Sequence, residues 1–159
     1  MLRYFAILII LTSASLTAKV TSDPVVAAKA FYSNHPDFHY TDPSGIRDLI
    51  TPRFFKALKS ESAVPKGELG AIDADPWTDA QDGDIHPPIT FTCVSNSGKA
   101  AKVEMRYIFF LDKNHSWPQT VILKLEKDPN STKWLISDLT TPHGGSLVDL
   151  IEKYHEKFP

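Results

Sequence analysis

The chain has 159 residues, of which 42% are hydrophobic and 23% are charged, a balance that suits one globular domain with a packed core and excludes a disordered chain. Its formal net charge of −2 and its pI near 6.3 provide no basic surface, so we expect no binding to nucleic acid or to an anionic membrane surface. Because Cys93 is the single cysteine, an internal disulfide is excluded.

Residues 1–22 have the pattern of a signal peptide. Arg3 supplies a positive start, residues 4–11 (YFAILIIL) are apolar, and a region rich in small residues follows. The apolar run is too short to span a bilayer, so we expect cleavage and no stable membrane anchor. Three cleavage positions remain open: after Ala14, Ala18 or Ser22. Cleavage after Ser22 leaves 15 basic and 19 acidic residues, a net charge of −4. The sequence thus predicts an exported protein, periplasmic or secreted.

The first part of the remaining chain has helical signals. Asp23, followed by proline, can cap a helix, and Pro36 ends it because the residue before a proline is pushed out of the α region. A turn at 42–45 precedes a short apolar stripe, and Thr51-Pro52 starts the next helix. The apolar residues at helical spacing, which we expect in the core, are Ala27, Ala28, Phe31, Ile46, Leu49, Ile50, Phe54, Phe55 and Leu58.

After Pro87-Pro88 the hydrophobic pattern changes to a period of two. Four runs alternate apolar and polar residues: 89–93, 101–109, 121–125 and 133–139. Turn-forming sequences separate them at 95–98, 112–115 and 128–130. The pattern predicts a four-stranded antiparallel meander with one buried face.

A helix is predicted to end the chain. Ser146 can cap it, with Asp149 three residues later as in a capping box. An apolar stripe follows at helical spacing: Leu147, Leu150, Ile151, Tyr154 and Phe158. Together, these signals predict one α+β domain over residues 23–159.

The stretch from Gly70 to Asp84 joins the helical half to the strands and is strongly acidic. It contains five carboxylates, and no Lys or Arg occurs between residues 67 and 98: Asp73, Asp75, Asp79, Asp82 and Asp84. A calcium site is one interpretation, but the stretch lacks the glycine and the final glutamate of an EF-hand loop, and Pro76 restricts wrapping. We therefore assign no metal and no cofactor.

Two other interpretations of this acidic loop stay open. In the first, it binds a small ligand or a basic protein partner, with site residues Asp75, Trp77, Asp79, Gln81 and Asp82. In the second, its aspartates accept backbone N–H bonds in turns and caps, and hold the helical half against the sheet.

The remaining reactive side chains give no catalytic or metal motif. The six histidines lie in loops or at element ends without zinc-ligand spacing, and no nucleophile elbow or phosphate-binding loop occurs. Cys93 alternates with Phe91 and Ile89, which indicates a small core residue and not a nucleophile.

Three segments carry a family resemblance: DADPWTDAQD, KWLISDL and GGSLVDLI. The chain resembles the bacterial domain of unknown function 3828 family, within the nuclear-transport-factor-2-like (cystatin-like) superfamily, over residues 24–158. The recurring motifs fall on Asp75-Pro76, Gln81-Asp82 and the strand from Trp134 to Asp138. The resemblance implies helices on a curved four-stranded sheet, a cone with an open mouth, and a sheet face that can form a homodimer. The lipid-attachment cysteine of some relatives is missing here.

The resemblance also implies how such a cone could work. Some relatives use an Asp or His inside the cone as a base, and here Asp138, in phase with Trp134 and Ile136, and Tyr107 are the polar groups expected there. We expect a non-enzymatic exported protein that binds a small ligand or a protein through the acidic loop. A periplasmic inhibitor or immunity protein, and a small enzyme using Asp138 and Tyr107, are the alternatives.

Overall fold

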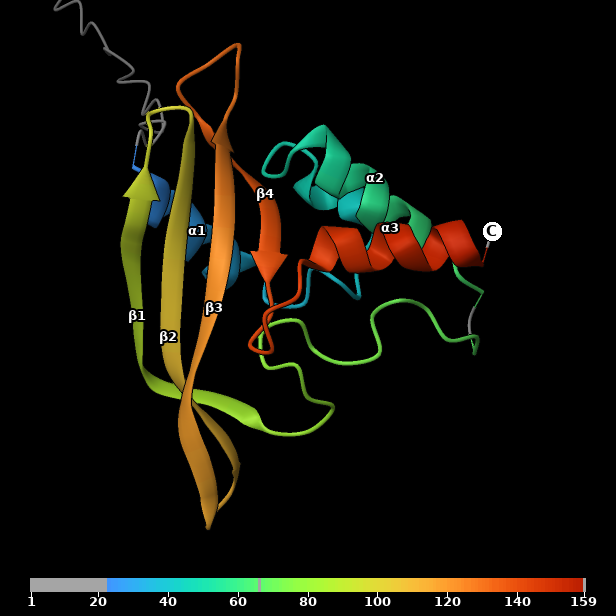
Figure 1. The fold of residues 1–159 in the computed structure, drawn as a ribbon, viewed down its shortest axis with the longest axis vertical. Helices are drawn as coiled ribbons and strands as arrows, with labels where there is room; N and C mark the ends of the chain where they lie inside the picture. The colour runs from blue at the N-terminus through green and yellow to red at the C-terminus, as the bar shows by residue number, and fades with distance from the viewer. Residues whose placement is uncertain (1–22, 66, 159) are drawn as a thin grey trace, which may run out of the picture.

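The structure, a computed structural model, describes residues 23–65 and 67–158, so the predicted signal peptide lies outside the described residues. Its elements follow the order helices, strands, helix (Figure 1): α1 (Pro24–Asn34), the 3₁₀ helix η1 (Pro43–Ile46), α2 (Pro52–Glu61), β1 (Asp84–Asn96), β2 (Ala100–Asp112), β3 (His115–Lys127), β4 (Trp134–Thr140) and α3 (Leu147–Lys157). The sheet is antiparallel in the order β1-β2-β3-β4. The predicted α+β fold, with helices before and after a four-stranded antiparallel sheet, is confirmed.

The helix starts follow the predicted capping chemistry. Asp23 accepts the N–H of Val25 at 2.8 Å, Thr51 caps α2, and Ser146 caps α3 by accepting the Asp149 N–H at 3.1 Å. Each cap uses a side-chain oxygen to satisfy an N–H that the first helical turn leaves unpaired. These local signals therefore place the helices where the sequence predicts them.

The helices and the acidic loop lie on one side of the sheet (Figure 1). The inward positions of β2 and β3 are buried as alternation predicts, whereas Ile89 of β1 is exposed, and the helical half supplies the other side of the core. The core includes Phe31, Phe54, Val103, Met105, Leu123, Leu125, Trp134, Ile136 and Ile151. The β2–β3 hairpin extends beyond the helical layer at the lower end of the view (Figure 1).

Strand β1 differs from its prediction. It begins at Asp84, before the two prolines, and not after them. A register shift between His86 and Thr90 accommodates Pro87-Pro88 at the edge of the sheet, where proline is tolerated. Cys93 is partly exposed and not fully buried, because β1 is the edge strand and little covers it.

Strand β4 differs from its prediction at Asp138, a candidate catalytic residue. Ile136 pairs with Leu125 but Asp138 pairs with Lys124, so a bulge between them shifts the alternation by one residue. Asp138 is therefore out of phase with Trp134 and Ile136, contrary to the prediction. Leu139, the next residue, is fully buried opposite Leu123 and continues the core face.

No helix among the described residues has the length and apolar character needed to cross a membrane.

His39 makes stability depend on pH. Both of its ring nitrogens are buried without a hydrogen-bond partner within the described residues, and burial lowers its pKa to about 4, with Asp37 acting in the opposite direction. In the unfolded chain the imidazole takes up a proton near its ordinary pKa of about 6.5, but in the folded protein it stays neutral until about pH 4. The folded state is therefore fully stable above pH 6.5 and loses stability as the pH falls towards 4. Because the residue as a whole is partly exposed, we expect a loss of about 1–2 kcal/mol.

Urea denaturation of the wild type and of His39→Phe across pH 7 to 4 measures this effect. The variant should show a shallower pH dependence, whereas His86→Phe, a change of an exposed imidazole, should keep the wild-type slope. Equal slopes for all three proteins would assign the acid sensitivity to other groups.

Candidate functional site

The acidic loop is a hydrogen-bonded turn at its centre. The Asp75 N–H donates to the Ala80 carbonyl at 3.1 Å, and the Asp79 N–H donates to the Asp75 carbonyl at 2.7 Å. The Asp75 carboxylate accepts the Trp77 N–H at 2.9 Å. Asp79 has a φ of 54°, a conformation that Asp adopts more readily than most residues. Asp75 thus has the structural role that the second interpretation predicts.

Burial changes the acidity of Asp75. It raises the pKa of this carboxyl, the hydrogen bond from Trp77 lowers it, and the charge of Asp37 raises it further. Since the carboxylate is partly withdrawn from water and already accepts a backbone N–H, little of it is available to a partner.

Trp77 lies in the core. Only 1% of its surface is exposed, and its indole N–H donates to the Pro36 carbonyl at 2.7 Å. Its ring contacts Phe31, Tyr32 and Phe38 at centroid distances of 5.1–6.3 Å. The indole therefore fills the space between the helical half and the sheet and offers no surface to a partner, contrary to the prediction.

Asp79, Gln81 and Asp82 have different roles. The Asp79 carboxylate accepts the Thr141 hydroxyl at 3.1 Å and lies 2.6 Å from His143 Nδ1, so it connects the loop to the segment between β4 and α3. The Gln81 amide donates to the Asp73 carbonyl at 3.3 Å on the surface. Asp82 is exposed. Of the five predicted site residues, Gln81 and Asp82 therefore present the most side chain to solvent.

Asp138 and Tyr107 are occupied by separate structural contacts. Asp138 is 6% exposed, accepts the Val148 N–H at the start of α3 at 3.1 Å, and pairs with Lys124 at 2.7 Å. The buried Tyr107 hydroxyl contacts the Trp77 carbonyl and lies 2.8 Å from Gln119 Oε1. Burial raises the pKa of Tyr107, and the charge of Asp75 adds to this rise. Asp138 is out of phase with the core face that carries Tyr107, and each group has a structural hydrogen-bond partner of its own.

Glu61, which the sequence analysis did not single out, holds three segments together at the end of α2. Its carboxylate accepts the N–H groups of Ala71 and Ile72 at 3.1 and 2.9 Å and lies 3.0 Å from His155 Nε2 on α3. Its side chain is 10% exposed. A Cβ at Gly70 would lie 2.1 Å from Glu61 Oε1, so this close approach needs a glycine. An acid in the last turn of a helix is electrostatically unfavourable, and that is the signal that could have identified it.

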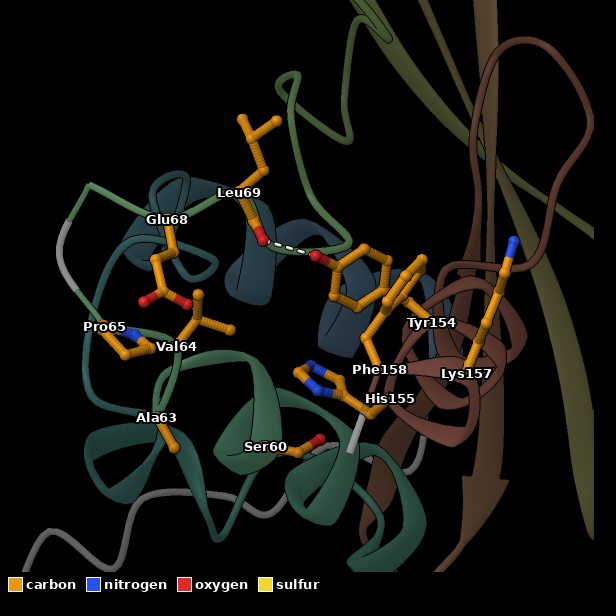
Figure 2. Close-up of a pocket in the computed structure, with 10 residues that line it drawn as sticks. All are labelled: Ser60, Ala63, Val64, Pro65, Glu68, Leu69, Tyr154, His155, Lys157 and Phe158. Carbon is orange, nitrogen blue, oxygen red and sulfur yellow. Dashed lines mark hydrogen bonds between the residues drawn. The ribbon is translucent and has the colours of Figure 1, made fainter.

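A cleft of about 530 Å³ opens beside this carboxylate (Figure 2). Ten residues from the end of α2, the following loop and the end of α3 line it: Ser60, Ala63, Val64, Pro65, Glu68, Leu69, Tyr154, His155, Lys157 and Phe158. Figure 2 shows the His155 ring directed into this space and the Tyr154 hydroxyl donating to the Leu69 carbonyl, which connects α3 to the loop. The volume falls within the range of about 300–1,000 Å³ usual for small-molecule sites.

Two large apolar side chains on the cleft rim are exposed to solvent. Leu69 is 81% and Phe158 54% exposed. Glu68 is also exposed, and its carboxylate makes no hydrogen bond or ion pair with the described part of the chain. The cleft thus offers a ligand apolar area and the exposed Glu68 carboxylate.

The described residues contain no group of three or more His, Cys, Asp or Glu side chains that could hold a metal ion. The fold defines an α+β protein with helices on one face of an antiparallel meander. Comparison with family models, with curated proteins and with solved structures finds no match.

Proposed function

We propose that this protein is an exported, non-enzymatic binding protein that holds a small ligand in the cleft between the carboxyl ends of α2 and α3. The observation that carries the proposal is the cleft itself, of about 530 Å³, whose rim exposes Leu69, Phe158 and Glu68, a carboxylate without an ion pair among the described residues. The acidic loop begins at the wall of this cleft, because residues 67–72 run from its rim to the first aspartates.

The structural use of the alternative catalytic groups supports a binding role over catalysis. Asp138 caps α3 and Tyr107 supports the Trp77 backbone, so both have roles in the fold that explain their burial. Export rests on the leader-like residues 1–22, and the resemblance to the domain of unknown function 3828 family supports a bacterial periplasmic setting. Mass determination of the amino terminus of the purified exported protein tests the leader.

Amide chemical shifts of the purified protein test the cleft. The probes are three molecules that differ mainly in charge: 2-phenylethylammonium, 3-phenylpropionate and neutral 2-phenylethanol. We expect at least one of them to shift the amide signals of residues 60–69 and 154–158 in a saturable manner. If every saturable shift falls on the sheet or on α1, the cleft is not the ligand site.

A second candidate is a periplasmic inhibitor or immunity protein that places the acidic loop in a basic active site. The specific observation in its favour is that Asp73, Asp82 and Asp84 are exposed and form no ion pair with the described part of the chain. A stoichiometric complex with a basic enzyme, lost in an Asp82→Asn, Asp84→Asn double variant, is the expected result. Homodimerisation through the outer sheet face is a separate proposal, which sedimentation of the purified protein tests.

A further inference from the structure

The helices α2 and α3 lie side by side and point in the same direction. Near their starts, Arg53 contacts Asp149 at 2.7 Å and Glu152 at 2.6 Å. At the other end, Glu61 contacts His155 at 3.0 Å. Both carboxyl termini therefore lie at the same end of the helix pair, as the two ribbons in Figure 1 show, and residues from both ends line the cleft.

Two helix ends and two carboxylates contribute negative potential at the cleft, and the Lys157 ammonium, which also lines it, opposes them. Each helix carries roughly half a negative charge at its carboxyl end, and the effect is concentrated in the last turn. Glu68 adds a full charge on the rim, and Glu61 adds another behind the His155 ring.

An aromatic pair forms one wall. The rings of Tyr154 and Phe158 lie with their centroids 5.0 Å apart, and the Lys157 ammonium lies 5.2 Å from the centroid of Phe158. A cation is attracted to the face of an aromatic ring by the ring's quadrupole. This wall therefore already interacts with an ammonium group from its own chain.

From these charges and rings we infer that the cleft binds a small organic cation, an ammonium group carried on an apolar body. The ammonium group would lie near the Glu68 carboxylate, and the apolar body would contact Val64 and the Tyr154–Phe158 pair. The inference rests on the proposed function, since it assigns a ligand class to the same cleft.

Calorimetric titration and amide shifts with the three probes test the sign of the charge. We expect 2-phenylethylammonium to bind more tightly than 2-phenylethanol, and 3-phenylpropionate to bind most weakly. Tightest binding of 3-phenylpropionate in the cleft would overturn the inference but leave the proposed function standing. Equal binding of all three probes would also overturn it, and no shift in the cleft with any probe would overturn both.

Two substitutions, one removing a negative and one a positive charge from the cleft, test the inference further. Glu68→Gln should weaken 2-phenylethylammonium binding by about fivefold, the size of an exposed ion pair. Lys157→Gln removes a competing ammonium and should strengthen the same binding by about two- to threefold.

The matched control is Glu126→Gln, which removes one negative charge from the exposed side of β3. It should leave 2-phenylethylammonium binding unchanged. An equal loss in Glu126→Gln and Glu68→Gln would show a response to net charge alone and would contradict the inference.

Discussion

Replacement of Trp77 with alanine is expected to lower the free energy of unfolding by about 3–5 kcal/mol, as large aromatic deletions in cores do. The indole is 1% exposed and contacts rings from α1 and the following turn, so its removal leaves a cavity that these elements cannot fill by small shifts. The Pro36 carbonyl would also lose its donor. Urea denaturation followed by circular dichroism measures the change.

The control for this experiment is Trp117→Ala. Trp117 is 42% exposed, and its ring centroid lies 4.9 Å from that of Phe109. Its removal should therefore lower the free energy of unfolding by only about 1 kcal/mol. If Trp77→Ala lowers the free energy of unfolding as little as Trp117→Ala does, Trp77 is not part of the core. Its role as a binding residue would then be open again.

Replacement of Glu61 with glutamine is expected to cost about 2–3 kcal/mol, since a buried carboxylate that accepts two backbone N–H bonds is lost. Glutamine can accept one of the N–H groups of Ala71 and Ile72, but its own NH₂ then faces the other donor. Denaturation measures the loss, and Glu156→Gln, on the exposed face of α3, should change stability by less than about 0.5 kcal/mol.

A double-mutant cycle with Gly70 isolates this contact. Gly70→Ala places a methyl group 2.1 Å from Glu61 Oε1, and the carboxylate cannot move aside without losing its N–H bonds. We therefore expect Gly70→Ala to cost much less in a Glu61→Ala background than in the wild type. Additive costs would show that Gly70 and Glu61 do not interact as the structure indicates.

The acidic loop illustrates why the fold was easier to predict than the site. Its composition singles out a run of carboxylates, but composition does not state which side chains are buried. Asp75 and Trp77 are fixed by backbone groups of their own turn and of Pro36, a contact over 41 positions of sequence that no local pattern encodes. The prediction therefore gave Trp77 the wrong environment.

The predicted position of Asp138 was wrong for a related reason. Period-two alternation assumes regular pairing, and a bulge in β4 reverses the phase after Ile136. Only the register against β3 and the position of the α3 amino terminus reveal that Asp138 caps a helix.

The sequence by itself determined the elements of this protein. Caps at Asp23, Thr51 and Ser146, the strand alternation and the turn residues depend on neighbours within a few positions, so the helices, the meander and their order follow from local chemistry. The tertiary structure alone decided the cleft. Its parts come from residues 60–69 and 154–158, and they meet because Glu61 accepts N–H groups from one segment and contacts His155 on another. Contacts between segments so distant along the chain depend on the packing of whole helices, which residue spacing does not specify.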